Sequence, residues 1–117
     1  MKLSNSLLGF TLVLAISAPP AFSGEPVTGG ALKKLVSGFE GTNGGFMIAF
    51  SSNGNVKMVD GSDVYEGTWY VTSDSVCTEI KALRNGAPTC RTVTDEGGGR
   101  FKMTRADNGK SLNLVRQ

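Results

Sequence analysis

The chain has 117 residues, a net charge of +2, two cysteines and no histidine. This length allows one domain with a modest core and excludes two domains with separate cores. The near-neutral charge argues against general electrostatic binding of nucleic acid, and the lack of histidine removes the usual proton shuttle and the commonest metal ligand.

The first 23 residues have the pattern of a secretory signal peptide. Lys2 gives a short cationic start, the run from Leu7 to Ile16 is apolar, and Ala21 and Ser23 are small residues just before Gly24. We therefore predict cleavage after residue 23, a single mature domain over residues 24–117, and a periplasmic or secreted location. The cleavage region has no cysteine for a lipid, and no later apolar run approaches the roughly 20 residues of a membrane-crossing helix, so we expect no membrane insertion.

One short amphipathic helix is predicted near the start of the domain. After an extended lead-in over residues 25–30, Leu32, Leu35 and Val36 fall at helical spacing, and Gly38 suits the left-handed position just past a helix end. The helix should cover residues 31–37. The stretch 39–45 is rich in glycine and asparagine and predicts a loop.

From Phe46 onward, short alternating segments are separated by turn residues, which is typical of an antiparallel sheet wound by hairpins. Asparagine or aspartate followed by glycine, as at Asn53-Gly54 and Asn108-Gly109, tolerates the positive φ of tight hairpins. We predict a mainly β fold, a meander of about seven strands that forms a small lipocalin-like barrel or half-barrel, with the helix over an open end or edge. The predicted strands are Phe46 to Ser51, Asn55 to Val59, Val64 to Val71, Val76 to Leu83, Thr89 to Thr94, Arg100 to Arg105 and Ser111 to Val115.

Alternation along these strands assigns one face to the core. The predicted core residues are Phe46, Ile48, Phe50, Val56, Met58, Tyr65, Trp69, Val71, Val76, Ile80, Phe101, Met103, Leu112 and Leu114. Cys77 and Cys90 fall on the other face, and an exported chain favours their pairing as a disulfide. A two-residue turn at Asn85-Gly86 would leave them four positions out of line, so a disulfide requires a longer loop or a bulge between Leu83 and Pro88.

The order of these elements resembles a known family. The residues that carry the resemblance are Ser37-Gly38, the strand Phe46 to Phe50, Ser52-Asn53-Gly54-Asn55-Val56, Glu66-Gly67-Thr68-Trp69-Tyr70-Val71, Asp74-Ser75-Val76-Cys77 and Cys90. They are similar to small exported alphaproteobacterial proteins of the family catalogued as domain of unknown function 995. The resemblance implies an exported β protein with cysteines on neighbouring strands, and it implies no chemistry. The chain departs from the commoner pattern because Glu79 and Lys81 stand where a tryptophan follows the first cysteine.

No catalytic or cofactor-binding constellation is present in the sequence, and we predict no enzyme and no cofactor. Asp60, Asp63 and Glu66 have a spacing that could collect calcium, but the regular ligand order of a calcium loop is absent, so we interpret them as an acidic hairpin and predict no metal site. The glycines between 38 and 45 precede a strand and do not open a helix, which excludes a phosphate-binding loop of the usual kind.

Charge is distributed unevenly. Acidic residues outnumber basic ones between residues 24 and 80, and basic residues prevail from Lys81 onward. We favour pairing of these charges across adjacent strands, and a basic face for an anionic partner is the alternative.

Function is predicted from what the fold can present. The leading hypothesis is a non-enzymatic binding module of the cell envelope whose partner is a protein or a glycan. Its candidate surface comprises Tyr70, Lys81, Asn85 and Arg100, with Glu66, Thr68 and the disulfide beside Tyr70. Two alternatives stay open: a carrier of a small apolar ligand inside the barrel, and a periplasmic inhibitor of a hydrolase that uses a loop such as 85–88 or 96–100.

Overall fold

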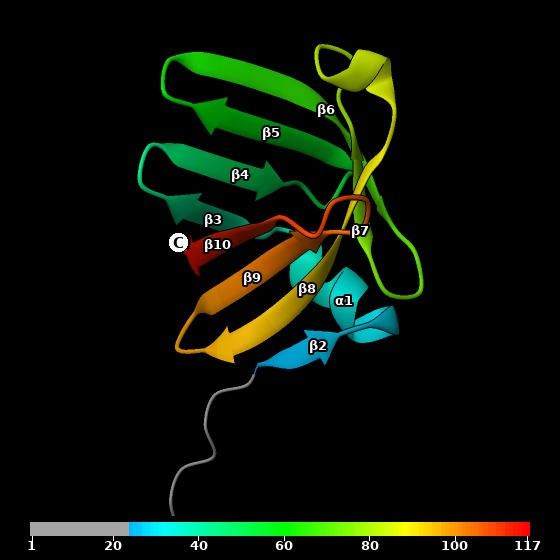
Figure 1. The fold of residues 1–117 in the computed structure, drawn as a ribbon, viewed down its shortest axis with the longest axis vertical. Helices are drawn as coiled ribbons and strands as arrows, with labels where there is room; N and C mark the ends of the chain where they lie inside the picture. The colour runs from blue at the N-terminus through cyan, green and yellow to red at the C-terminus, as the bar shows by residue number, and fades with distance from the viewer. Residues whose placement is uncertain (1–23) are drawn as a thin grey trace, which may run out of the picture.

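The computed structural model describes residues 24–117, so the predicted signal peptide lies outside the described residues. The described part forms an antiparallel barrel with one short helix (Figure 1). Its elements, in chain order, are β2 (Glu25–Val27), α1 (Gly29–Val36), β3 (Glu40–Asn43), β4 (Phe46–Phe50), β5 (Asn55–Asp60), β6 (Asp63–Val71), β7 (Val76–Glu79), the 3-10 turn η2 (Arg84–Gly86), β8 (Thr89–Gly97), β9 (Arg100–Arg105) and β10 (Ser111–Arg116).

Eight of the strands close into the barrel. Neighbouring strands follow the order β8, β7, β6, β5, β4, β3, β10, β9, and β9 pairs back to β8. β2 is an extra strand that pairs with β8 beyond the end of β7, with Val27 opposite Val93. The prediction of a mainly β barrel with one short helix is therefore confirmed, and the half-barrel alternative is not needed.

Three predicted boundaries were wrong. The helix begins at Gly29 and ends at Val36, so residues 29 and 30, predicted as extended, are helical and residue 37 is not. Residues 40–43, predicted as part of a loop, form β3, because their backbone pairs with β4 on one side and with β10 on the other. The predicted strand Val76 to Leu83 ends at Glu79, because the chain then leaves the sheet for the connection that contains η2. The turn within the predicted loop is only Gly44-Gly45, between β3 and β4.

The helix closes one end of the barrel. Leu32 and Val36 are fully buried in the core cluster, and α1 contacts β6 and β7. The amide of Gly29 donates to the carbonyl oxygen of Ser73 at 2.9 Å, and the amide of Gly38 donates to the carbonyl oxygen of Phe50 at 2.8 Å. The start of the helix is therefore fixed to the β6–β7 turn, and the residue that follows the helix is fixed to the end of β4. Gly38 has φ +85°, as predicted for the residue just past the helix.

Aromatic rings fill the barrel interior. The rings of Phe39 and Phe101 meet edge-on at 5.3 Å, and those of Phe50 and Trp69 at 5.9 Å. The indole N–H of Trp69 donates to the carbonyl oxygen of Ser51 at 2.8 Å, which satisfies its polar group inside the core. Every predicted core residue is buried or packs against the core cluster; Leu32, Val36, Phe39 and Val93 complete it.

Close packing between β6 and the end of β7 predicts that residue 67 must be glycine. A Cβ at Gly67 would overlap the carbonyl oxygen of Glu79 and approach Ile80 Cγ1 at 2.8 Å, so the backbone would have to move. We expect Gly67→Ala to lower the free energy of unfolding by about 1–3 kcal/mol, the usual cost of overpacking. Urea unfolding measures this. Gly45→Ala is the matched control, because a Cβ there meets nothing within 4 Å, and equal stabilities of the two variants would contradict the argument.

Candidate functional site

Cys77 and Cys90 form the predicted disulfide and are directly opposite each other on β7 and β8, with 4.0 Å between their Cα atoms. The pairing of Cys77 with Cys90 requires a loop longer than two residues, as predicted from the sequence. Residues 80–88 form this loop, with η2 in the middle. Cys77 is fully buried, and Tyr70 lies opposite it on the neighbouring strand β6. Tyr70 therefore lies beside the disulfide, as the candidate surface required.

The other residues of the predicted surface lie in two separate places. Lys81 and Asn85 belong to the connection between β7 and β8, and both are exposed. Arg100 begins β9, which β7 and β8 separate from β6 in the sheet order. The barrel thus places Tyr70, Lys81 and Asn85 on one side and Arg100 on another.

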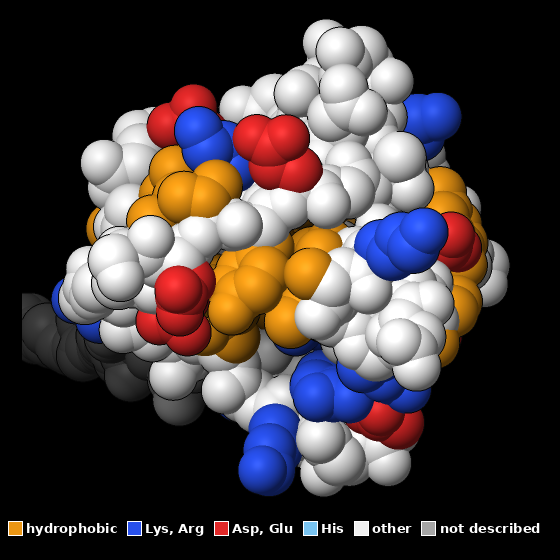
Figure 2. All heavy atoms as spheres, turned by 90° about the horizontal axis from the view of Figure 1, so that it is seen from above, with side chains coloured by type: hydrophobic (Ala, Val, Ile, Leu, Met, Phe, Trp, Pro, Cys, Tyr) orange, Lys and Arg blue, Asp and Glu red, His pale blue; other side chains and the backbone are white. Residues whose placement is uncertain are grey.

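The first of these places includes the outer face of β6. Val64 and Tyr70, two of the large exposed hydrophobic residues, both belong to β6. Figure 2 views the molecule from the side where β5, β6 and the β7–β8 connection lie uppermost in Figure 1, and it shows hydrophobic side chains gathered near the centre with charged groups around them. A hollow of about 520 Å³ opens over β4 to β6, with Lys57, Glu66 and Thr68 in its lining.

The second place is the seam at which the barrel closes. β3 and β10 pair only through Thr42 with Val115 and Gly41 with Arg116. From Ser111 to Leu114, β10 pairs with β9 alone, so its other edge has no strand beside it among the described residues. The amide of Gln117 donates to Glu40 and its side-chain amide donates to Thr42 Oγ1, both at 2.9 Å, so the seam is tied at one end and open at the other.

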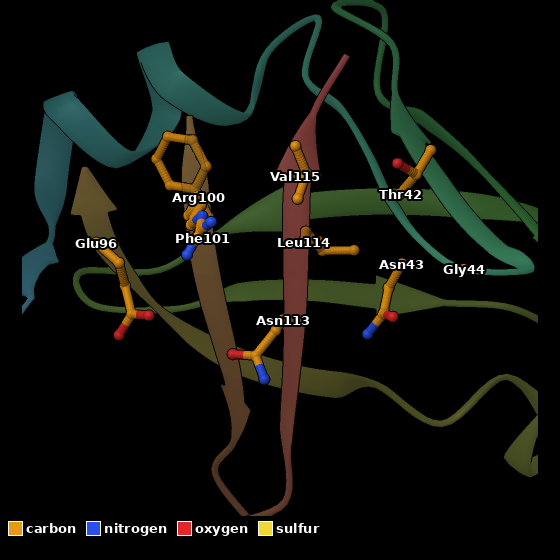
Figure 3. Close-up of a pocket in the computed structure, with 9 residues that line it drawn as sticks. All are labelled: Thr42, Asn43, Gly44, Glu96, Arg100, Phe101, Asn113, Leu114 and Val115. Atoms are coloured by element: carbon orange, nitrogen blue, oxygen red, sulfur yellow. The ribbon is translucent and has the colours of Figure 1, made fainter. Parts of the chain in front are cut away.

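A hollow of about 590 Å³ lies along this seam (Figure 3). Thr42 and Asn43 line it from β3, and Asn113 and Val115 line it from β10. Arg100 lies on the far side of β10 in Figure 3 and is the register partner of Val115, so its charge stands next to an exposed apolar side chain. Val115 is 52% exposed. The remaining lining residues are Gly44, Glu96, Phe101 and Leu114.

The composition of the open edge distinguishes β10 from β6. β6 also has an open edge, because it has no β7 partner between Asp63 and Gly67. That stretch of β6 carries two acidic residues, at positions 63 and 66. Charged edge strands resist pairing with another chain, whereas the edge from Ser111 to Leu114 carries no charge. Of the two edges, that of β10 is therefore the better template for a further strand.

Of the residues that line the hollow at the seam, the sequence analysis named Arg100 as a candidate surface residue and did not name Thr42, Asn43, Asn113 or Val115. The signal for Val115 was present, since Leu112 and Leu114 occupy the inward positions of its strand and leave an apolar residue facing outward. The seam itself depends on pairing between distant segments, which alternation along the chain does not report.

Within residues 24–117, no helix has the length and apolar character needed to cross a bilayer, and no group of three or more acidic or cysteine residues is arranged to hold a metal ion. No family model matches the chain, and no curated protein or solved structure matches it either.

The disulfide generates a stability prediction. Replacing both cysteines by alanine in Cys77→Ala/Cys90→Ala should lower the free energy of unfolding by about 2–4 kcal/mol, because the cross-link restricts the unfolded chain. Urea unfolding of the wild type and the variant, each with and without dithiothreitol, measures this. Dithiothreitol should lower the midpoint of the wild type only, and an unchanged wild-type midpoint would contradict the prediction.

Proposed function

We propose that this protein is an exported, non-enzymatic binding module of the cell envelope that binds an extended segment of a partner protein at the seam between β3 and β10. The observation that carries the proposal is the open, uncharged edge of β10 beside a hollow of about 590 Å³. Unpaired backbone N–H and C=O groups of an edge strand are satisfied by a strand added from another chain.

Several features of the seam support a protein segment over a glycan. A strand of polypeptide can form main-chain hydrogen bonds along Ser111 to Leu114, and its alternate side chains can contact the hollow. The exposed apolar group there is aliphatic Val115, whereas glycan platforms typically rely on aromatic rings. Arg100 offers a guanidinium that makes no ion pair or hydrogen bond with the described residues, so it can fix an acidic group of the partner.

The packed interior supports surface binding over a ligand carrier. The rings of Phe39, Phe50, Trp69 and Phe101 contact one another across the barrel, and α1 closes one end. An eight-stranded barrel is just wide enough for side chains to fill it. Both hollows described above are open to the outside, although the one at the seam reaches Phe101 and Leu114.

The same proposal includes export of the protein from the cytoplasm. The leader pattern in residues 1–23 supports it, and the Cys77–Cys90 disulfide is consistent with an oxidising compartment. Membership of the family of exported proteins that the sequence resembles is likewise part of the proposal.

A matched pair of valine variants tests the partner surface. Val115→Asp should abolish recovery of the partner from a cell-envelope extract, because a carboxylate beside the β10 edge would oppose docking of an apolar strand. Val64→Asp is the control: Val64 is similarly exposed, at 55%, but lies on β6. Affinity capture followed by mass spectrometry measures which proteins depend on residue 115.

Amide hydrogen exchange then locates the contact. The captured partner should slow exchange in residues 111–114, and Arg100→Glu should weaken its binding about tenfold or more, as expected for loss of a charge-assisted contact. Loss of the partner in Val64→Asp alone would move the site to β6, and equal recovery by both valine variants would reject a surface site at either place.

A further inference from the structure

Three arginines meet where the β7–β8 connection approaches the turn after β9. Arg84 lies in η2, and Arg91 and Arg105 are direct register partners on β8 and β9. By the alternation of these strands, Arg91 and Arg105 share the faces of the buried residues Val93 and Met103. Their guanidinium groups therefore lie on the core-facing side, at the barrel end opposite α1.

One carboxylate, that of Asp107, contacts two of the three arginines. Asp107 Oδ1 accepts from Arg105 Nε at 3.0 Å, and its Oδ2 accepts from Arg105 Nη2 at 2.7 Å. Arg84 Nη1 is 3.7 Å from the same Oδ2. The hydrogen bond from Arg105 lowers the pKa of Asp107, and Arg84 adds to the effect, so this carboxylate is ionised at neutral pH. The cluster keeps an excess of two positive charges.

Arg91 has no counter-charge of its own. It makes no ion pair and no side-chain hydrogen bond with any residue in the described range 24–117, although it is half-buried. Burial, and then the repulsion of Arg105, lower the pKa of Arg91, and the nearby negative charge of Asp107 offsets this only in part. Arginine nevertheless stays protonated in proteins, so a half-buried charge is compensated only in part, by an Asp107 carboxylate that Arg105 and Arg84 also approach.

The backbone around Arg84 is strained in a way that serves the cluster. Arg84 and Asn85 have φ values of 53° and 55°, and they are the described non-glycine residues with positive φ. Asparagine tolerates this region, but a long side chain such as arginine occupies it rarely. The strained conformation places Arg84 Nη1 at 3.0 Å from both the carbonyl oxygen of Pro88 and Thr89 Oγ1, close to Asp107. Strain of this kind concentrates at binding sites.

We propose that Arg84, Arg91 and Arg105 form a binding site for a phosphoryl group. A phosphate monoester carries about −1.5 to −2 charges at pH 7, which matches the excess charge of the cluster. Its three terminal oxygens can accept from several guanidinium forks at once, whereas both oxygens of the Asp107 carboxylate already accept from the single fork of Arg105. The site is built from residues other than those of the β3–β10 seam, so it does not depend on the proposed partner surface.

Free phosphate, a soluble phosphate ester and a phospholipid headgroup all present this chemistry. The first test is calorimetric titration and thermal unfolding of residues 24–117 with inorganic phosphate, glycerol phosphate and acetate at equal ionic strength. Phosphate or glycerol phosphate should bind and raise the melting temperature, since a ligand that binds only the folded state stabilises it, and acetate should do neither.

Two charge-neutralising variants distinguish binding at the arginine site from general attraction of an anion to the protein's positive charge. Arg91→Gln should weaken phosphoryl binding about tenfold or more. Lys110→Gln is the matched control, because it removes the same charge from an exposed position in the turn that also carries Asp107. Without phosphate, Arg91→Gln should melt at or above the wild-type temperature, since it removes a half-buried charge that Arg105 repels and that makes no ion pair among the described residues.

A third variant and a vesicle assay complete the test. Arg84→Gly removes a guanidinium and the unfavourable φ together, so it should raise the melting temperature while weakening phosphoryl binding. Sedimentation with phosphatidylglycerol vesicles is compared with sedimentation with phosphatidylcholine vesicles. A lipid headgroup is the source of the phosphoryl group if the protein binds only the phosphatidylglycerol vesicles and Arg91→Gln abolishes that binding. The proposal is overturned if no phosphoryl probe binds, if acetate binds equally well, or if Arg91→Gln and Lys110→Gln bind alike.

Discussion

Closure of the barrel depends on a seam in which only two residue pairs join β3 to β10, segments from opposite ends of the described chain. The strands can approach there because residue 41 is glycine: a Cβ would lie 2.7 Å from the ring of Phe39 and 3.0 Å from Leu114 Cβ. Phe39 in turn packs edge-on against Phe101 of β9. The ring of strands therefore closes over an aromatic side chain, and the same short seam leaves the edge of β10 open further along.

Much of the fold could be predicted from local pattern. The alternation of Phe46, Ile48 and Phe50, followed by asparagine and glycine, identifies a strand and a turn without knowledge of any partner strand. Residues 40–43 could not be found in this way, because Glu-Gly-Thr-Asn has neither apolar alternation nor β-branched enrichment. Their strand conformation comes from hydrogen bonding to β4 and β10, which is a property of the closed sheet.

The candidate sites were predictable only in part, because the register between neighbouring strands decides which residues lie opposite each other. Cysteine count and compartment predicted the Cys77–Cys90 bond, whereas its direct opposition depends on how residues 80–88 leave the sheet. The favoured pairing of charges across adjacent strands is found in one ion pair of the described residues, Lys102 on β9 with Glu96 on β8, and no ion pair joins the acidic part of the chain to the basic part. Arg91 faces Arg105, a juxtaposition that alternation cannot reveal because both residues simply occupy core-facing positions.

A filled barrel can offer binding groups only where its regular ladder stops. Two of the places where the ladder stops among the described residues are the β10 edge from Ser111 to Leu114 and the connection between β7 and β8. At the β7–β8 connection, the disulfide joins the two strands that flank the connection, so Arg84 lies within the cross-linked loop. Cys90 is also the immediate neighbour of Arg91. The covalent bond therefore holds a strained, positively charged loop against the strands that carry its other arginines, which the packing of an exposed connection alone would not do.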